Sequence, residues 1–285
     1  MNAGAITARG LLAAAAAGER SDDESAREVE LLLGHALDCD RAWLYAHADD
    51  ALAVETAVRF HGLLLRRARG EPIAYITGHR EFWSLDLGVT PDVLIPRAET
   101  ELLVEFALRR IPENAQVEIA DLGTGSGAVA LALARERRRA RMLATDVSAA
   151  ALAVARGNAE RLGIGNVEFA QGDWCEPLRG HQFDMIVSNP PYIADADVHL
   201  AQGDLRFEPR AALASGADGL DAIRAIMRGA SAFLKPGGWL LLEHGFEQGA
   251  AVHDIAIAHG FVDVSTLQDL EHRDRVCVAR RGNRD

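Results

Sequence analysis

An asparagine, two prolines and a tyrosine, Asn189-Pro190-Pro191-Tyr192, follow the apolar stretch that begins at Phe183. Prolines lack backbone donors and fix the turn, so the Asn189 side-chain carbonyl and the Pro190 backbone carbonyl can form a rigid pair of acceptors. Such a pair can hold both hydrogens of a planar –NH₂ group and bias its nitrogen towards a tetrahedral shape, while Tyr192 packs on the substrate's flat face. This chemistry needs orientation and electrostatics, without a covalent nucleophile or a metal. We therefore predict Asn189, Pro190 and Tyr192 as catalytic and Asn189 to Tyr192 as substrate contacts; the alternative is a plain proline turn.

A glycine-rich loop that starts at Asp121 has the features of a nucleoside-binding turn. Glycines between a strand and a helix allow a tight turn and a close approach to a ligand. The loop also satisfies the permissive dinucleotide fingerprint. Asp121 separates the two possibilities, because its carboxylate would repel a pyrophosphate but suits the cationic amino group of S-adenosylmethionine. We expect S-adenosylmethionine as the cofactor. The loop residues predicted to bind it are Asp121, Gly123, Thr124, Gly125, Ser126 and Gly127.

The next two expected strands end in side chains that fit the same cofactor. Asp146 can accept both ribose hydroxyls, although it could instead cap the next helix, as Ser148 also could. Asp173 can bond adenine and Trp174 can cover its ring, although a core position suits Trp174 alone equally well. Ligands of open α/β sheets bind at the carboxyl ends of strands. Three successive strand ends with fitting groups therefore predict one pocket.

The elements that must position these residues alternate after Glu99. Expected strands cover 117–121, 142–146, 167–172, 183–189 and 239–243, with helices between several of them. Such alternation is typical of a mostly parallel sheet with helices on both faces. We predict an α/β fold, a Rossmann-like sheet of the S-adenosylmethionine-dependent methyltransferase kind at 99–285.

Residues 1–78 contain only helical patterns, so a small all-α N-terminal domain is predicted there. A short hairpin is expected to link the two domains at 79–98. The N-terminal helix over 53–69 is predicted to turn a set of apolar side chains inward: Val54, Val58, Leu63, Leu64 and Leu65.

Composition excludes several function classes. The 285 residues carry a formal net charge of −12, so broad attraction to nucleic acid or anionic lipid is not expected. Three dispersed cysteines suit the reducing cytoplasm, and neither a structural metal site nor a disulfide framework is predicted. No stretch approaches the ~20 apolar residues that would span a bilayer.

The chain resembles amino-group methyltransferases and, more narrowly, the protein-glutamine N5-methyltransferases that modify peptide chain release factors. The resemblance covers nearly the whole chain and is weakest over 1–70. Ala98 stands where a proline is usual in the family. The further motifs that carry it are Glu71-Pro-Ile-Ala-Tyr-Ile-Thr-Gly78, Glu81-Phe-Trp, Leu94-Ile-Pro-Arg97, Glu99-Thr-Glu101, Phe207-Glu-Pro209 and Leu242-Glu-His-Gly245.

This resemblance implies a substrate and a partner. The substrate would be the glutamine of the glycine-glycine-glutamine loop in class 1 release factors, and the products N5-methylglutamine and S-adenosylhomocysteine. It also implies that Asn189 contributes to cofactor binding, that Arg97 belongs to the substrate site, and that the N-terminal domain helps to grip the release factor.

Other functions are compatible with parts of the sequence. A nucleic-acid methyltransferase acting on adenine N6 or cytosine N4 could use Asn189-Pro-Pro-Tyr192, but such enzymes usually need a basic surface, and we expect no stable nucleic-acid partner. Glutamine methylation on a ribosomal protein is a close variant. A non-catalytic binding protein has no need for two acceptors aimed at an amine, and a nicotinamide dehydrogenase conflicts with Asp121.

Overall fold

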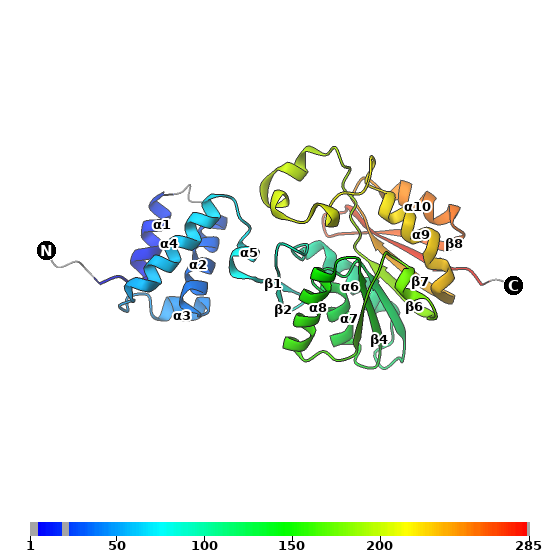
Figure 1. Cartoon of the computed structure of the whole chain (residues 1–285), viewed down its shortest axis with the longest axis horizontal. Helices are drawn as coiled ribbons and strands as arrows, with labels where there is room; N and C mark the ends of the chain where they lie inside the picture. The colour runs from blue at the N-terminus through cyan, green and yellow to red at the C-terminus, as the bar shows by residue number, and fades with distance from the viewer. Residues whose placement is uncertain (1–4, 19–22, 284–285) are drawn as a thin grey trace. The chain divides into compact units, whose positions relative to one another are not determined.

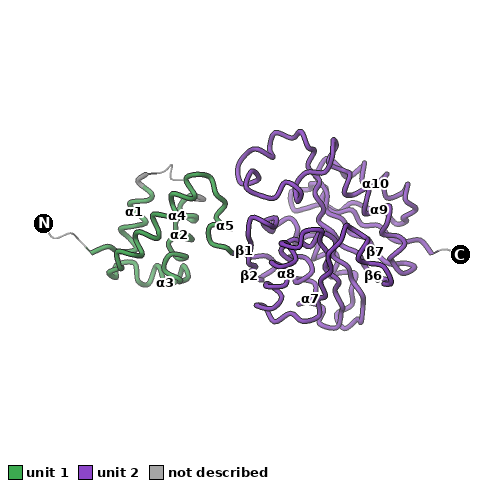
Figure 2. The backbone as a smooth tube through the Cα atoms, in the orientation of Figure 1, with its two compact units in different colours: residues 1–78 green, residues 79–285 purple. Residues whose placement is uncertain are grey.

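The computed structural model describes residues 5–18 and 23–283, so the parts of the predicted domains at 1–4, 19–22 and 284–285 lie outside it. The chain divides into two compact units, Met1–Gly78 and His79–Asp285 (Figure 2). Each described unit has a hydrophobic core made from its own residues.

The first unit is helical. Its elements are α1 (Ala8–Gly18), α2 (Asp23–Leu37), α3 (Arg41–Ala46), α4 (Val54–Ala68) and α5 (Ile73–Thr77). The core uses one face of α2, with Leu32 and Leu33 fully buried, and meets Phe60 and Leu63 of α4. Asp40 begins α3 by accepting a hydrogen bond from the Trp43 amide at 2.7 Å, as an N-cap residue should.

One prediction for α4 is wrong. Val54, Val58 and Leu65 were expected to face inward, but their side chains are 62%, 68% and 49% exposed. Leu63 is buried as expected, and Phe60 supplies the rest of the buried face. At 100° per residue, positions 54, 58 and 65 fall on one stripe opposite that face, so the helix has apolar side chains on both sides.

The second unit begins with a hairpin of β1 (His79–Phe82) and β2 (Leu85–Gly88), paired antiparallel. Trp83 and Ser84 form its turn with φ of 50° and 55°, the left-handed conformation that matches the twist of a two-residue hairpin. The Trp83 amide also donates to Glu101 Oε1 at 2.8 Å. The hairpin therefore lies at 79–88, which is the first half of the segment 79–98 where it was expected.

A seven-stranded sheet forms the centre of this unit (Figure 1). In spatial order its strands are β5 (Val167–Gln171), β4 (Arg141–Asp146), β3 (Glu118–Leu122), β6 (Phe183–Ser188), β7 (Leu234–Glu243), β9 (Asp274–Arg281) and β8 (Phe261–Gln268). The first five are parallel, and β9 pairs antiparallel with both neighbours. Strand order reverses between β3 and β6, which is where ligands bind in such sheets.

Helices cover both faces of the sheet. They are α6 (Glu101–Arg110), α7 (Ala128–Glu136), α8 (Ala149–Leu162), α9 (Asp221–Phe233) and α10 (Gly249–Ala258). The short 3-10 segments are η1 (Ala98–Thr100), η2 (Glu176–Leu178), η3 (Val198–Ala201), η4 (Gly203–Phe207) and η5 (Arg210–Ala212).

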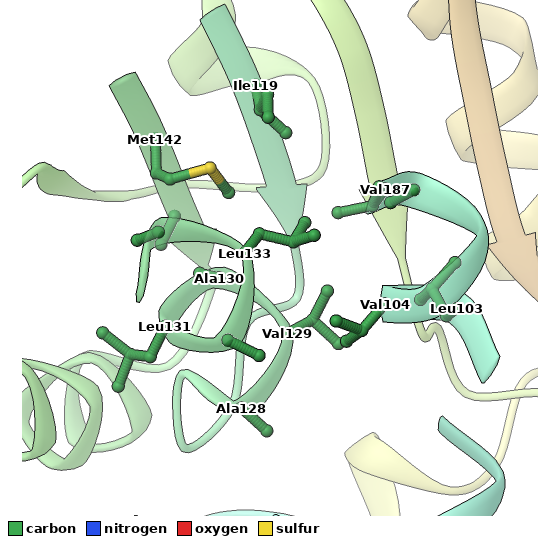
Figure 3. Packing of buried hydrophobic residues seen from close by; sticks show 14 of the residues in the cluster. Leu103, Val104, Ile119, Ala128, Val129, Ala130, Leu131, Leu133, Met142 and Val187 are labelled. Atoms are coloured by element: carbon green, nitrogen blue, oxygen red, sulfur yellow. The ribbon is translucent and has the colours of Figure 1, made fainter. Parts of the chain in front are cut away.

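Period-2 alternation along the strands divides the interior into two clusters. Ile119 and Val187 join the cluster of α6 and α7, shown in Figure 3, while Ala120 and Ile186 join the cluster of α9 and α10. Both faces of the parallel strands are thus buried. The predicted α/β sheet with a helical N-terminal region is confirmed.

The Asn158 side chain of α8 joins the hairpin to the glycine-rich loop. Its Oδ1 accepts from the Gly88 amide at 2.7 Å, and its Nδ2 donates to the carbonyls of Gly88 and Ser126, both at 2.9 Å. The Asn158 side chain is buried, so these bonds are shielded from water.

Candidate active site

A cavity of about 340 Å³ lies where β3, β4, β5 and β6 end, a volume typical of small-molecule sites. All of its lining residues belong to the second unit. Those predicted from the sequence are Arg97, Asp121, Gly123, Thr124, Gly125, Ser126, Asp146, Asp173, Trp174, Asn189 and Pro191. Gly127, Pro190 and Tyr192 stand beside lining residues in the chain but do not themselves line the cavity in the part of the structure described here.

The glycine-rich loop turns sharply between β3 and α7. Gly127 has a φ of 87°, and a Cβ there would lie 3.0 Å from Leu131 Cδ1 and 3.3 Å from Ala155 Cβ. Gly123, at φ 69°, would place a Cβ 3.5 Å from the Trp174 ring. Glycine is required at Gly127 by both conformation and space, and at Gly123 chiefly by conformation.

Asp121 is the buried acid of the site, with 2% of its surface exposed. It accepts a hydrogen bond from Thr124 Oγ1 at 2.7 Å. Burial raises the pKa of its carboxyl to about 7, against the lowering effect of Thr124 and the Ala130 backbone. No basic side chain of the described residues forms an ion pair with Asp121. A ligand cation would satisfy this acid and favour its ionised form.

Asp146 lines the cavity and orders the backbone on either side of it, but it is not the residue that caps the next helix. Its Oδ2 accepts from the Gly125 amide and its Oδ1 from the Ser148 amide, each at 2.9 Å. Ser148 in turn caps α8 by accepting from the Ala151 amide at 3.1 Å. Because each carboxylate oxygen has a second lone pair, Asp146 can order the loop and still accept ligand hydroxyls.

Asp173 and Trp174 follow β5 at the edge of the cavity. Trp174 has a φ of 38°, which is unusual for a residue with a side chain. Its indole packs partly against the core under α9 while also lining the cavity. One side chain therefore both packs against the core and lines the cavity.

The segment Asn189 to Tyr192 leaves the end of β6. Asn189 donates from Nδ2 to Thr100 Oγ1 at 3.0 Å, which leaves Oδ1 as its acceptor at the cavity. The Tyr192 hydroxyl donates to Glu243 Oε1 at 3.2 Å, and its backbone carbonyl accepts from Gln248 Nε2 at 2.9 Å. The structure thus holds both ends of the segment in place.

Two residues of this site, Thr100 and Glu243, were not predicted as functional. Glu243 ends β7 with 1% of its surface exposed, and burial raises the pKa of its carboxyl to about 7. The signal that singled out Asp121 and Asp146, an acid at the carboxyl end of an apolar strand, was also present at Glu243. Thr100 has no such signal.

Arg97 lines the cavity but pairs with Glu208, whose side chain is fully buried. Glu208 Oε2 also accepts from the Ile95 amide at 3.0 Å. One carboxylate therefore fixes the segment around Arg97 to the loop between β6 and α9.

As for metals, the described ranges contain no group of three or more His, Cys, Asp or Glu side chains that could hold an ion.

Comparison with known proteins covers most of the chain. Residues 99–216 match the family described as methyltransferase small domain, and residues 10–78 match the PrmC N-terminal domain. A release factor glutamine methyltransferase of Xylella fastidiosa (strain 9a5c) is 56% identical over 89% of this chain and 92% of its own length. Proteins of the same name from Coxiella burnetii and Pseudomonas aeruginosa are 49% and 48% identical, over 90% and 91% of this chain and 91% and 94% of their own.

Solved structures share the fold at low identity. A methyltransferase from Pyrococcus furiosus has a TM-score of 0.53 at 18% identity, covering 78% of this chain and 98% of its own. A 16S rRNA N2 G1207 methyltransferase of T. thermophilus, solved with AdoMet and guanosine, has a TM-score of 0.52 at 22% identity, covering 72% and 50%.

Proposed function

The chain belongs to the family of release factor glutamine methyltransferases, and from this premise we propose its reaction in detail. It is an enzyme, and its methyl donor is S-adenosylmethionine. The proposed acceptor is the side-chain amide nitrogen, N5, of the glutamine in the glycine-glycine-glutamine loop of class 1 peptide chain release factors. The observation that carries this proposal is the placement of Asn189 on the same cavity as Asp121 and Asp146.

The residues around the cavity fit this donor. Buried Asp121 suits its cationic amino group, Asp146 suits its ribose hydroxyls, and Trp174 suits its adenine ring, with Asp173 beside it. Gly123 to Gly127 give the backbone room to approach a ligand closely. When bound, S-adenosylmethionine supplies an electrophilic methyl group attached to a sulfonium.

Asn189 and Pro190 prepare the amide nitrogen for methylation. In the proposed complex, Asn189 Oδ1 and the Pro190 carbonyl accept its two N–H groups, which weakens the delocalisation of the lone pair into the amide. Methyl transfer would form a new N–C bond as the methyl–sulfur bond of the donor breaks, which would leave S-adenosylhomocysteine, and the nitrogen would lose one proton to water. Tyr192 and Pro191 would bound the flat face of the glutamine side chain, and Arg97 would contribute to the substrate site through the segment that it anchors. Orientation and electrostatics supply the catalysis.

We also propose a division of labour along the chain. Residues 1–78 form a substrate-recognition domain, 79–98 a hairpin linker, and 99–285 the catalytic domain. Support comes from α4, whose stripe of Val54, Val58 and Leu65 exposes apolar area that a monomeric domain would normally bury. A release factor is the partner that the proposed reaction requires.

The proposed setting is the cytoplasm, where release factors act on ribosomes. Within the ranges that the structure covers, none of the helices combines the length and the apolar character needed to cross a bilayer. We propose no stable nucleic-acid partner, since the net charge of −12 would oppose binding to phosphates.

Transfer of a labelled methyl group from S-adenosylmethionine tests the proposal. Intact release factor, its variant with alanine for the loop glutamine, bulk RNA and bulk DNA are offered in parallel. Label on the intact factor and none on the variant is the expected result. Label on RNA or DNA instead would overturn the proposed substrate.

A further inference from the structure

A chain of polar side chains lies behind Asn189 and ends at a buried acid. Asn189 Nδ2 donates to Thr100 Oγ1 at 3.0 Å, and the Tyr192 hydroxyl donates to Glu243 Oε1 at 3.2 Å. Thr100 also acts on Glu243 by hydrogen bonding that lowers the pKa of its carboxyl. Glu243 thus contacts Tyr192, the last residue of the segment 189–192, directly, and Asn189, the first residue, through Thr100.

Glu243 and Thr100 are neighbours in this series of side chains, and each has a hydrogen-bonding position without an assigned partner. Glu243 Oε2 is buried and has no well-aligned hydrogen bond from the described residues. The Thr100 oxygen accepts from Asn189, so its own hydroxyl proton is available for another acceptor. A hydroxyl rotates freely to suit its surroundings, and a buried acceptor without a donor is costly. We therefore expect the Thr100 hydroxyl to donate its hydrogen bond to Glu243.

We propose that Thr100 and Glu243 are positioning residues, which set the direction of this hydrogen-bonded chain and thereby fix which end of the Asn189 carboxamide faces the cavity. The inference rests on the proposed function, because it concerns the acceptor that Asn189 offers to the glutamine amide. Neither residue contacts the reacting atoms in this scheme.

The direction of the chain follows from the ionised acid. A carboxylate can only accept, so Thr100 must donate to Glu243 and accept from Asn189. Asn189 then turns its NH₂ group inward and leaves Oδ1 for the substrate. If Glu243 carries a proton, it can donate to Thr100, and the Thr100 hydroxyl can donate to Asn189 Oδ1. The Asn189 carboxamide can then rotate by about 180°, so that its NH₂ group faces the cavity. In that orientation it offers donors to the N–H groups of the substrate, and the substrate amide is not held for methylation.

Four neighbouring groups bias the ionisation of Glu243. Burial raises the pKa of its carboxyl, and the charge of Glu99 adds to this rise. Hydrogen bonds from Thr100 and Tyr192 and the charge of Arg275 act in the opposite direction. Arg275 itself is held by Asp269, to which its Nε donates at 3.0 Å. The protonation of Glu243 therefore changes near neutral pH, where it can affect the rate.

Substitutions of Thr100 in the full-length protein provide the main test. Thr100→Val keeps the shape and removes the hydroxyl, and we expect kcat for release factor to fall about 10- to 100-fold, as misorientation of a reacting group does. The KM for S-adenosylmethionine should stay unchanged. Thr100→Ser restores the hydroxyl and should recover most of the lost kcat. Thr266→Val, a half-buried threonine of β8, is the control and should match wild type.

Glu243→Gln supplies a second, independent measurement. Glutamine can both donate and accept, so it no longer dictates the direction of the chain. Wild-type kcat at saturating substrates is expected to fall as the pH drops through the pKa of Glu243, and Glu243→Gln should have a lower kcat without this acid limb. Reading kcat separates the effect from cofactor affinity, which depends on Asp121.

The possible outcomes test the positioning role separately from the proposed function on which it rests. Wild-type transfer to release factor combined with an unaltered kcat for Thr100→Val overturns the positioning role alone. An acid limb that persists in Glu243→Gln also contradicts it. No transfer to release factor by the wild-type protein overturns the proposed function and the inference together.

Discussion

Asn189 is the one polar side chain of the segment 189–192 that also lines the cavity, so its loss should separate catalysis from cofactor binding. We expect Asn189→Ala to lower turnover of release factor at least ~100-fold, comparable to the loss of one preorganised group that stabilises a transition state. The loop from Gly123 to Gly127 is unchanged in this variant, so most cofactor affinity should survive. Turnover comes from labelled-methyl transfer and affinity from calorimetry.

The matched control is Asn114→Ala, an exposed asparagine that lies between α6 and β3. Its turnover should equal that of the wild-type protein. Normal turnover in Asn189→Ala would contradict the proposed mechanism.

Asp121 makes cofactor binding dependent on pH. Its carboxyl has a pKa of about 7 without ligand, and only the ionised form attracts a cation. Affinity for S-adenosylmethionine should therefore rise as the pH increases through 7 and then level off. Asp121→Asn should bind about 10- to 100-fold more weakly above that pH, since hydrogen bonds to charged groups contribute about 1.5–3 kcal/mol. Calorimetry across this pH range checks both; equal slopes in the two proteins would contradict the assignment.

The same burial has an opposite effect on ligand-free stability. The pKa of Asp121 is raised from 3.8 to about 7, so the folded state holds this proton more tightly than the unfolded chain does. Its favourable contribution is present below pH 3.8 and is lost as the pH rises towards 7. Asp121→Asn should accordingly melt at a higher temperature than wild type at pH 8 without cofactor, although it binds that cofactor less well.

At the level of elements, the turn from β3 into α7 depends on Gly127. Gly127→Ala forces a side chain into φ 87° and against Leu131 and Ala155. We expect a loss of 1 kcal/mol or more in unfolding free energy, about the cost of a strained left-handed residue, and weaker cofactor binding. Denaturant unfolding and calorimetry measure the two effects.

Gly157→Ala is the counterpart, because a Cβ there meets nothing within 4 Å and the residue lies inside α8. Alanine should stabilise that helix by about 0.5–1 kcal/mol. If both alanine variants changed stability alike, the conformation assigned to Gly127 would be wrong.

Local sequence patterns predicted the strands that are continuous apolar runs. The apolar runs that became β3 and β6 are buried on both faces, and such runs are recognisable without a structure. The antiparallel strand β8 lacks this signal, because it mixes Asp263, Ser265 and Gln268 with its apolar residues and leaves much of its surface exposed. Its partner β9 does contain a buried apolar run, at 276–279, but the run is only four residues long. Their pairing depends on contacts distant in the sequence.

The site was predictable where chemistry and strand ends coincide. Asp121 lies one residue before the end of β3, Asp146 ends β4 and Trp174 follows β5, and all three line the cavity. Thr100 lies 89 positions from Asn189, and only the tertiary fold brings the two within 3.0 Å. Glu208 likewise reaches Arg97 across 111 positions, a pairing that no local pattern encodes.

For the whole molecule, the apolar stripe on α4 should matter for a protein substrate and not for a peptide. Val58→Asp in the full-length chain is expected to raise the KM for release factor about 10-fold, the effect of losing a moderate contact in an interface. Methylation of a short glycine-glycine-glutamine peptide should be unaffected. Steady-state kinetics with both substrates separates the two.

Leu270→Asp is the control for this prediction, because Leu270 is fully exposed in the second unit and outside the cavity. Its KM for release factor should not change. An equal KM for wild type and Val58→Asp would remove α4 from the recognition surface.

Three of the hydrogen bonds of the Asn158 side chain couple the thermal fluctuations of two segments that are distant in the sequence. A transient opening of β2 at Gly88 breaks the same side-chain anchor that restrains the Ser126 carbonyl. Conversely, a ligand that restricts the motion of the glycine-rich loop lowers the frequency with which the hairpin opens, since local unfolding is cooperative among elements that share a contact. Protection of the Gly88 amide from solvent exchange would thus report on events in the pocket, carried by one buried carboxamide.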